Sequence, residues 1–399
     1  MNNAVRIVIL FIGITAFSLL GCGGGEPAEQ TESVEETETV GQEESTDVTP
    51  AAEAGGANSA VEAISIDVGT TTGELETEEN EDWYVFSVEG GETFELTFAP
   101  GDEAEAISFD VLNGELDCIW YESNVRPPVT QTFSYMTSAE AGGDYYVEVS
   151  QGQPGTYSIE LSKQMQNDAN SGIDAGNSAV QAIEIATDVP FEGQVGDLDE
   201  NDWYAFEIPQ GDIFTLTFTP GDDTESIDID IYNSELDCYW YESNVHPGVT
   251  VNKTVIMSSS SGDTYYAEVS DGKGAYTLEI SLTSQDDAGI GTDAGDRAVD
   301  AVPVELGNMY TGLLGDYDEQ DWFSVEIAEG QIVGFTVTPG DDGETLDVDM
   351  YSPEQDNLGY ESNIAAGVTC EMSLPENSPA GTYYLELSDG QGSYSFVIE

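Results

Sequence analysis

Positive charge is what this chain has least of. Its 399 residues include six Lys and Arg against 80 Asp and Glu, and the formal net charge is -74. Nucleic acids and anionic lipid headgroups are bound through positive surfaces, so this composition excludes both as direct partners. Repulsion on this scale opposes compact folding unless salt or divalent cations screen it. We therefore expect a high-salt (halophilic) setting, bound metal ions, or both.

Residues typical of catalytic sites are also scarce. The chain has a single histidine, His246, and no G-x-S-x-G, H-E-x-x-H or glycine-rich phosphate loop. With 80 acidic residues, numbers alone do not identify a carboxylate pair suited to glycoside hydrolysis. The sequence therefore predicts a non-enzymatic protein, with a secreted hydrolase as the third interpretation behind two others given below.

Long hydrophobic runs are limited to the N-terminus. Arg6 precedes an apolar run, residues 7–20, that is short for a membrane span and typical of a cleaved secretory signal. The run ends in Leu-Leu-Gly-Cys, which resembles the bacterial lipoprotein signal. The resemblance implies that residues 1–22 are a signal peptide, that Cys22 is lipidated, and that the protein faces outside the cytoplasm, at the outer membrane or cell surface. An ordinary signal peptide with an incidental cysteine is the alternative.

Residues 23–57 contain no aromatic side chain and many Glu residues. Such a segment cannot bury enough apolar surface to offset its ordering entropy. We expect a disordered acidic tether, extended by the repulsion of its like charges.

The rest of the chain repeats three times. The motif before an aromatic strand recurs at Trp83, Trp203 and Trp322, so the period is 203 − 83 = 120 and then 322 − 203 = 119 residues. Within each unit, short runs alternate apolar and polar residues, and Gly, Pro and Asp interrupt them. This pattern predicts an all-β chain of three tandem antiparallel β-sandwiches, jelly-roll-like, joined by linkers. The predicted sandwiches are residues 58–163, 177–283 and 296–399, with linkers at 164–176 and 284–295.

Three motifs carry a family resemblance: the NDWY or QDWF strand and the D-x-D-x-Y strand of the second and third units, and the closing G-x-Y hairpin of all three units. They resemble the bacterial pre-peptidase C-terminal domain. That family comprises small β-sandwiches attached to secreted proteases and surface proteins, some of which bind calcium, collagen or polysaccharide. This chain departs from the family in context, because no peptidase precedes the domains.

An acidic loop precedes the aromatic strand in each unit. Alternating oxygen-bearing side chains suit a hard cation with six to eight oxygen ligands, although the Gly and Glu of a complete EF-hand loop are absent. The candidate ligands in the second and third units are Asp197, Asp199, Asn201, Asp202, Asp316, Asp318 and Asp321. In the first unit Thr77 replaces an aspartate, so Glu79 and Asp82 are expected to bind weakly or not at all.

The two linkers supply further candidates, Asp168 and Asp174 in one and Asp287 and Asp293 in the other. The family resemblance implies calcium where such a linker meets a sandwich. Solvated turns whose aspartates cap backbone amides remain the alternative.

Paired aromatic residues mark another strand of each unit. Alternation sends neighbouring side chains to opposite faces, so one ring of each pair should be exposed and could stack on a ligand. The candidates for binding an extracellular polysaccharide or protein are therefore Trp120, Tyr121, Trp240, Tyr241 and Tyr360. Core packing is the alternative role.

Cys118, Cys238 and Cys370 occur singly in their units, so intradomain disulfides are excluded. We expect buried thiols, with an interdomain or intermolecular disulfide as the alternative. Together these features predict a lipid-anchored, calcium-stabilised adhesion or binding module. A structural spacer without a ligand face is the second interpretation.

Overall fold

The computed structural model describes residues 57–399, except 78–79, 105, 151–153, 261, 342 and 377. Cys22, the tether as far as residue 56, and the candidate ligand Glu79 lie outside the described residues. Within this part of the chain, no helix has the length and hydropathy needed to cross a membrane. The helices there are 3-10 turns of three residues each: η1 (Ala60–Glu62), η2 (Asp168–Asn170), η3 (Ala179–Gln181), η4 (Asp287–Gly289) and η5 (Ala298–Asp300).

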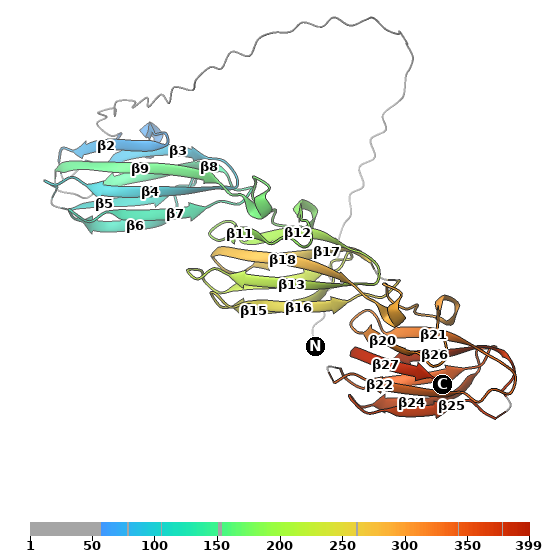
Figure 1. The fold of residues 1–399 in the computed structure, drawn as a ribbon. Coiled ribbons are helices and arrows are strands. Elements are labelled where there is room, and N and C mark those ends of the chain that lie inside the picture. The colour runs from blue at the N-terminus through green and yellow to red at the C-terminus, as the bar shows by residue number, and fades with distance from the viewer. Residues whose placement is uncertain are drawn as a thin grey trace, which may run out of the picture. The chain divides into compact units, whose positions relative to one another are not determined.

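The chain is all-β, as predicted, and each repeat folds into two packed sheets (Figure 1). The first sandwich pairs a five-stranded sheet of order β1-β3-β8-β5-β6 with a four-stranded sheet of order β2-β9-β4-β7. Its strands are β1 (Ile64–Ser65), β2 (Gly69–Leu75), β3 (Asp82–Val88), β4 (Glu92–Pro100), β5 (Ile107–Leu112), β6 (Cys118–Val125), β7 (Gln131–Met136), β8 (Gly143–Ser150) and β9 (Gly155–Met165).

The second sandwich has the same topology, with sheets of order β10-β12-β17-β14-β15 and β11-β18-β13-β16. Its strands are β10 (Ile183–Glu184), β11 (Phe191–Val195), β12 (Asn201–Ile208), β13 (Asp212–Pro220), β14 (Ile227–Tyr232), β15 (Cys238–Val245), β16 (Val251–Ile256), β17 (Asp263–Ser270) and β18 (Gly274–Ser284).

The third sandwich repeats it again, as β19-β21-β26-β23-β24 and β20-β27-β22-β25. Its strands are β19 (Val302–Pro303), β20 (Met309–Leu314), β21 (Gln320–Ile327), β22 (Gly334–Pro339), β23 (Leu346–Tyr351), β24 (Asn357–Ile364), β25 (Cys370–Ser373), β26 (Gly381–Ser388) and β27 (Gly392–Ile398). In all three units a two-residue strand pairs in parallel with the aromatic strand, while the other pairings are antiparallel.

Alternation along the strands builds a separate core in each sandwich. In β4 the side chains of Phe94, Leu96 and Phe98 are buried, and the residues between them are at least partly exposed. Fully burying one such side chain contributes roughly 1.5–3 kcal/mol. Each core is therefore large enough to stabilise a sandwich of its own.

The cysteines depart from expectation. Cys118 and Cys238 are free and exposed, and Cys370 is free and half-buried. Cys118 and Cys238 begin β6 and β15, which lie at the edges of their five-stranded sheets. The prediction of buried thiols was wrong for these two, because the first residue of an edge strand is not covered by a neighbouring strand.

Candidate metal centres

Two groups of buried carboxylates lie where a linker meets the sandwich that follows it. The first cluster contains Asp168, Asp174, Asp199 and Asp202, and the second contains Asp287, Asp293, Asp318 and Asp321. Every one of these side chains is at most 4% exposed. All four carboxylates of the second cluster, and Asp168, Asp174 and Asp202 of the first, offer oxygens within 4.8 Å of one another.

A tight turn places the loop aspartates. In the second sandwich, Gly196 and Asp199 exchange two backbone hydrogen bonds of 2.7 Å, and β12 starts two residues later. This turn directs Asp199 and Asp202 to the same buried space. Gly315 and Asp318 form the equivalent turn in the third sandwich, with bonds of 2.9 and 2.6 Å. The converging carboxylates are thus three residues apart, not two as the alternating pattern suggested.

The linker aspartates are fixed by backbone amides. Asp168 accepts hydrogen bonds from the amides of Ala175 and Gln194, both 3.0 Å long. In the second cluster Asp287 accepts them from Ala294 at 3.0 Å and Leu313 at 2.9 Å. Each linker therefore closes on itself and also binds to a strand of the following sandwich, β11 or β20.

A tyrosine hydroxyl donates to the innermost carboxylate of each sandwich. Tyr276 donates to Asp202, and Tyr394 donates to Asp321. A glycine on the adjacent strand makes room for each ring: a Cβ atom at Gly193 would come within 2.4 Å of the Tyr276 hydroxyl, and one at Gly312 within 2.0 Å of the Tyr394 hydroxyl. The glycines of β11 and β20 are therefore required by the site.

Several oxygens in and beside the two clusters are buried without any hydrogen-bond partner among the described residues. They come from the same positions in both repeats. Around the first cluster they are Gln166 Oε1, Asp174 Oδ1, Asn177 Oδ1, both oxygens of Asp199, and Asp202 Oδ1. Around the second they are Gln285 Oε1, Asp293 Oδ1, Asp296 Oδ1, both oxygens of Asp318, and Asp321 Oδ1. A buried unpaired oxygen is costly, so each set favours a partner that supplies positive charge, either bound protons or a cation.

The pKa values of the cluster aspartates also indicate that their charged forms are unfavourable without a positive partner. Burial, reinforced by the neighbouring carboxylates, raises the pKa of Asp199 to about 9 and that of Asp318 to about 12. Burial likewise raises the pKa of Asp174 to about 7 and that of Asp293 to about 8. Asp296 adds to this effect on both Asp293 and Asp321, which places it beside the second cluster.

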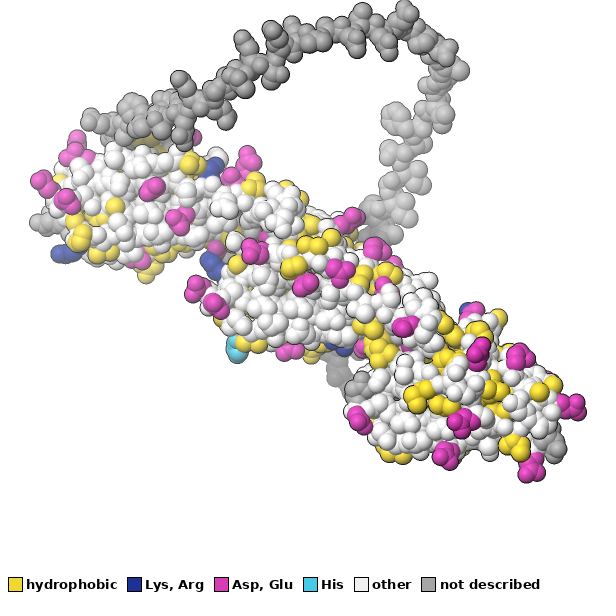
Figure 2. Space-filling model, in the orientation of Figure 1, with side chains coloured by type: hydrophobic (Ala, Val, Ile, Leu, Met, Phe, Trp, Pro, Cys, Tyr) yellow, Lys and Arg dark blue, Asp and Glu magenta, His cyan; other side chains and the backbone are white. Residues whose placement is uncertain are grey.

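No basic side chain of the described residues neutralises the clusters. The four ion pairs found there involve Glu92, Asp197, Asp300 and Asp316, none of which belongs to a cluster. On the face drawn in Figure 2, Asp and Glu side chains are scattered and Lys and Arg are few. A bound cation would supply the charge that the protein itself does not.

The preceding sandwich helps to shape each site. The amide nitrogen of Gln166 donates to the carbonyl of Thr137 over 2.8 Å, which leaves its oxygen for the cluster. Asp174 accepts a hydrogen bond from the amide of Ala139 in the same loop. In the next repeat Gln285 donates to Met257 over 2.6 Å, and Asp293 accepts from Ser259. Each site therefore lies at a joint between consecutive sandwiches.

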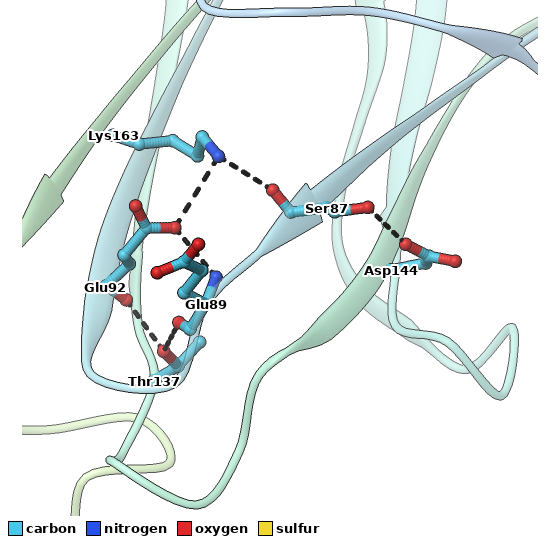
Figure 3. Close-up of polar contacts among 6 residues, drawn as sticks. All are labelled: Ser87, Glu89, Glu92, Thr137, Asp144 and Lys163. Carbon is cyan, nitrogen blue, oxygen red and sulfur yellow. Dashed lines mark hydrogen bonds and ion pairs between the residues drawn. The ribbon is translucent and has the colours of Figure 1, made fainter.

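Polar contacts brace the loop that carries Thr137 (Figure 3). The Thr137 hydroxyl donates to the carbonyls of Glu92, at 2.8 Å, and Glu89, at 3.2 Å. Lys163 pairs with Glu92 at 3.6 Å and donates to the carbonyl of Ser87 at 2.9 Å. The end of the first sandwich is thereby held in place where Gln166 contacts it.

Three predicted ligands of the second and third units, Asp197, Asp316 and Asn201, lie outside the clusters. Asp197 accepts a hydrogen bond from the Met136 amide at 2.9 Å and pairs with Lys273 at 2.7 Å. Asp316 accepts from the Tyr239 hydroxyl and pairs with Lys253 at 3.4 Å. Both carboxylates bind the preceding sandwich or a lysine, because the turn that begins at Gly196 or Gly315 directs them away from Asp199 and Asp318. Asn201 is the half-buried first residue of β12.

The first sandwich has no corresponding cluster among its described residues. Asp82 is buried and accepts a hydrogen bond from Tyr157, as its counterparts do from Tyr276 and Tyr394. The segment that precedes this sandwich and Glu79 lie outside the described residues.

Residue positions that sequence reasoning missed are Gln166, Gln285, Asn177 and Asp296. The repeat itself held the signal for the glutamines, since each precedes the first linker aspartate by two residues. A glutamine side chain does not by itself indicate cation binding, and only the structure shows that its oxygen is buried and unpaired.

The aromatic candidates separate as alternation predicts. Trp120 is half-buried and stacks on Phe133, with ring centroids 4.8 Å apart, whereas Tyr121 is exposed. Trp240 packs against the core of the second sandwich, whereas Tyr241 and Tyr360 are exposed.

Comparison with known proteins gives structural matches only. No family model matches the sequence, and neither does any curated protein. A solved pre-peptidase C-terminal domain of collagenase from Bacillus anthracis matches with a TM-score of 0.23 and 21% identity, over 26% of this chain and 100% of that one.

Two further solved structures match more weakly. An allantoicase has a TM-score of 0.17 and 10% identity, over 54% of this chain and 84% of that one. The BSP domain of a biofilm-associated protein has a TM-score of 0.15 and 8% identity, over 81% of this chain and 66% of that one. Scores and identities this low carry no functional argument.

Proposed function

We propose that this protein is a non-enzymatic, lipid-anchored surface module whose sandwiches are joined by calcium and which binds an extracellular polymer or protein. The observation that carries the calcium assignment is the pair of buried clusters with unpaired oxygens at matching positions.

The donor set favours calcium over other ions. Every candidate ligand is an oxygen, and the six unpaired oxygens around each cluster match the six to eight that calcium takes. Magnesium keeps several waters and is seldom enclosed by an all-protein cage, and softer metals prefer nitrogen or sulfur.

Calcium at these positions would order the joints. Each set of candidate ligands includes a glutamine bound to the preceding sandwich and two aspartates from the following one. A cation that binds all of them couples the orientation of consecutive sandwiches to ion binding. Extracellular calcium would keep such joints formed, which agrees with the proposed location outside the cytoplasm.

The exposed tyrosines favour binding over a purely structural spacer. Tyr121, Tyr241 and Tyr360 occupy the same position in successive sandwiches and remain exposed beside polar side chains. A spacer without a ligand face has no need of three exposed rings in equivalent places.

The test is a calcium titration of the metal-free protein by calorimetry, in high monovalent salt. We expect two saturable sites, and weaker binding of magnesium. The matched variants are Asp199→Ala and Asp318→Ala, each of which should remove one site and leave the other. Heats no larger than those of the salt background would overturn the calcium assignment and favour the spacer.

A further inference from the structure

A second feature repeats on the outer face of every five-stranded sheet. In the second sandwich, Trp203 lies opposite Glu268, Glu268 opposite Asp230, and Asp230 opposite Tyr241. Four neighbouring strands thus contribute one residue each to a row across the sheet. The equivalent rows are Trp83, Glu148, Asp110 and Tyr121 in the first sandwich, and Trp322, Glu386, Asp349 and Tyr360 in the third. We call these the Trp-Glu-Asp-Tyr rows.

The rows face outward. Ile229 and Ile231, on either side of Asp230 in β14, are fully buried, so Asp230 points to the opposite face. The tyrosine is the most accessible member, with 67%, 64% and 68% of its surface exposed in the three sandwiches. The tryptophan and the glutamate lie deeper, so a ligand would approach along the aspartate and the tyrosine.

The acidic pair in each row is unfavourable on its own. Like charges directly opposite one another across two strands destabilise a sheet. None of the four ion pairs among the described residues involves a row carboxylate. Burial and the opposing aspartate raise the pKa of Glu268 and of Glu386. The same unfavourable pair is nevertheless present in all three sandwiches.

In the second and third sandwiches, a tyrosine holds the deeper half of the row in place. In the second sandwich, Tyr232 stacks on Trp203 with centroids 5.1 Å apart and donates a hydrogen bond of 2.8 Å to Glu268. In the third, Tyr351 stacks on Trp322 at 4.9 Å and donates to Glu386 over 2.6 Å. Among the described residues, the outer tyrosine has no such partner, and its ring is exposed beside the aspartate.

We propose that each row binds an arginine side chain of a polypeptide partner. Neighbouring strands are roughly 4.8 Å apart, so one guanidinium group reaches both the aspartate carboxylate and the adjacent tyrosine ring. Guanidinium is planar, weakly hydrated and suited both to carboxylates and to stacking on aromatic faces, whereas ammonium is a compact and strongly hydrated charge. The proposal depends on the proposed binding function in one respect only, namely that the three rows bind the same partner together.

The probe is a synthetic peptide with several arginines separated by Gly-Ser spacers, titrated into the calcium-saturated protein at fixed ionic strength. Companion peptides carry lysine, or citrulline, an uncharged analogue of arginine, at the same positions. We expect arginine to bind more tightly than lysine, and citrulline to lose binding. The triple variant Asp110→Asn, Asp230→Asn and Asp349→Asn should weaken arginine binding by about tenfold or more, because several weak contacts are lost together.

The matched control neutralises three carboxylates on the other side of the same strands. Glu122→Gln, Glu242→Gln and Glu361→Gln follow the row tyrosines directly, and their cross-strand partners Phe109, Ile229 and Val348 face the core. This triple variant removes equal charge and should leave arginine binding nearly unchanged. Equal weakening in both triple variants, or equal binding of lysine and arginine, would show only general attraction to an acidic protein and overturn the proposal.

A third variant guards against misfolding. Tyr121→Ala, Tyr241→Ala and Tyr360→Ala alter exposed rings without touching the acidic pair, and should also weaken arginine binding. Calcium stoichiometry recorded on the same samples separates this proposal from the calcium assignment, since no row residue belongs to a cluster.

Discussion

The first sandwich shares its fold with the two that follow, but the described residues around its buried aspartate are different. Asp82, Asp202 and Asp321 occupy the same position and each accepts a tyrosine hydroxyl. Among the described residues, which exclude the segment before residue 57 and Glu79, linker aspartates and a turn aspartate lie beside Asp202 and Asp321 but not beside Asp82. One buried carboxylate with a hydrogen-bond donor is more easily accommodated in a sandwich than four together, which must be neutralised by protons or by a cation.

The largest expected effect concerns stability: removing one cluster carboxylate should destabilise the calcium-bound protein and stabilise the metal-free one. With calcium bound, Asp199→Ala removes a ligand and should lower the free energy of unfolding of the second sandwich by about 3–5 kcal/mol. In chelator, the same variant relieves repulsion among buried carboxylates and should be more stable than the parent. Thermal melts with calcium and with chelator measure both.

Asp82→Asn is the control for that prediction. It should lower stability equally in calcium and in chelator, by about 1–2 kcal/mol for an altered buried hydrogen bond, and leave the calcium stoichiometry unchanged. If Asp199→Ala also behaves identically in the two conditions, its cluster does not bind calcium.

A pH dependence should separate the metal-free protein from the calcium-loaded one. In the metal-free fold, burial raises the pKa of Asp174 to about 7 and of Asp199 to about 9, from 3.8. Groups with raised pKa values stabilise the fold fully below the unfolded value, and this contribution is lost as pH rises through the folded value. Metal-free stability should therefore fall between about pH 4 and pH 9, measured by denaturant melts.

Calcium binding should show the reverse dependence. Because the ion displaces protons from the clusters, its affinity should increase with pH over the same interval, and binding should release protons. Calorimetry in buffers of different ionisation enthalpy measures that release. Proton release near zero at pH 6 would mean that the carboxylates are already ionised without the metal.

Much of this arrangement could be predicted from the sequence, for identifiable reasons. The three-fold period and the alternation in segments such as residues 93–98 predict sandwiches, because strand burial follows a period of two. Asp168 was predicted from the paired aspartates of its Gly- and Ala-containing linker and Asp199 from the alternating oxygens of the acidic loop, and the structure brings both into one buried cluster. Gln166 and Asp296 were missed, and Asp197 was included, because the direction of a side chain depends on turns and on a neighbouring sandwich that spacing alone does not reveal.

A difference in the charge of one candidate ligand should give the two joints different calcium affinities. The position of Asn177 in the first joint is taken by Asp296 in the second, and both side chains have a buried unpaired oxygen. Calcium affinity depends on the number of charged ligands, so the second site should be the tighter one, by about tenfold. Exchanging the residues, as Asn177→Asp with Asp296→Asn, should reverse the order in a calcium titration. An unchanged order would show that these two positions do not bind the ion.

The smallest effect is expected at the aspartates outside the clusters. Asp197 is 2.7 Å from a half-exposed lysine, Lys273, and such pairs contribute roughly 0.2–1 kcal/mol. Asp197→Asn should therefore change calcium affinity by less than about twofold, while Asp199→Ala in the same loop abolishes the site. If both variants lose calcium equally, the loop binds the ion through its alternating residues after all, and the turn at Gly196 must rearrange when the ion binds. Calorimetric titration of the two variants side by side decides between these geometries.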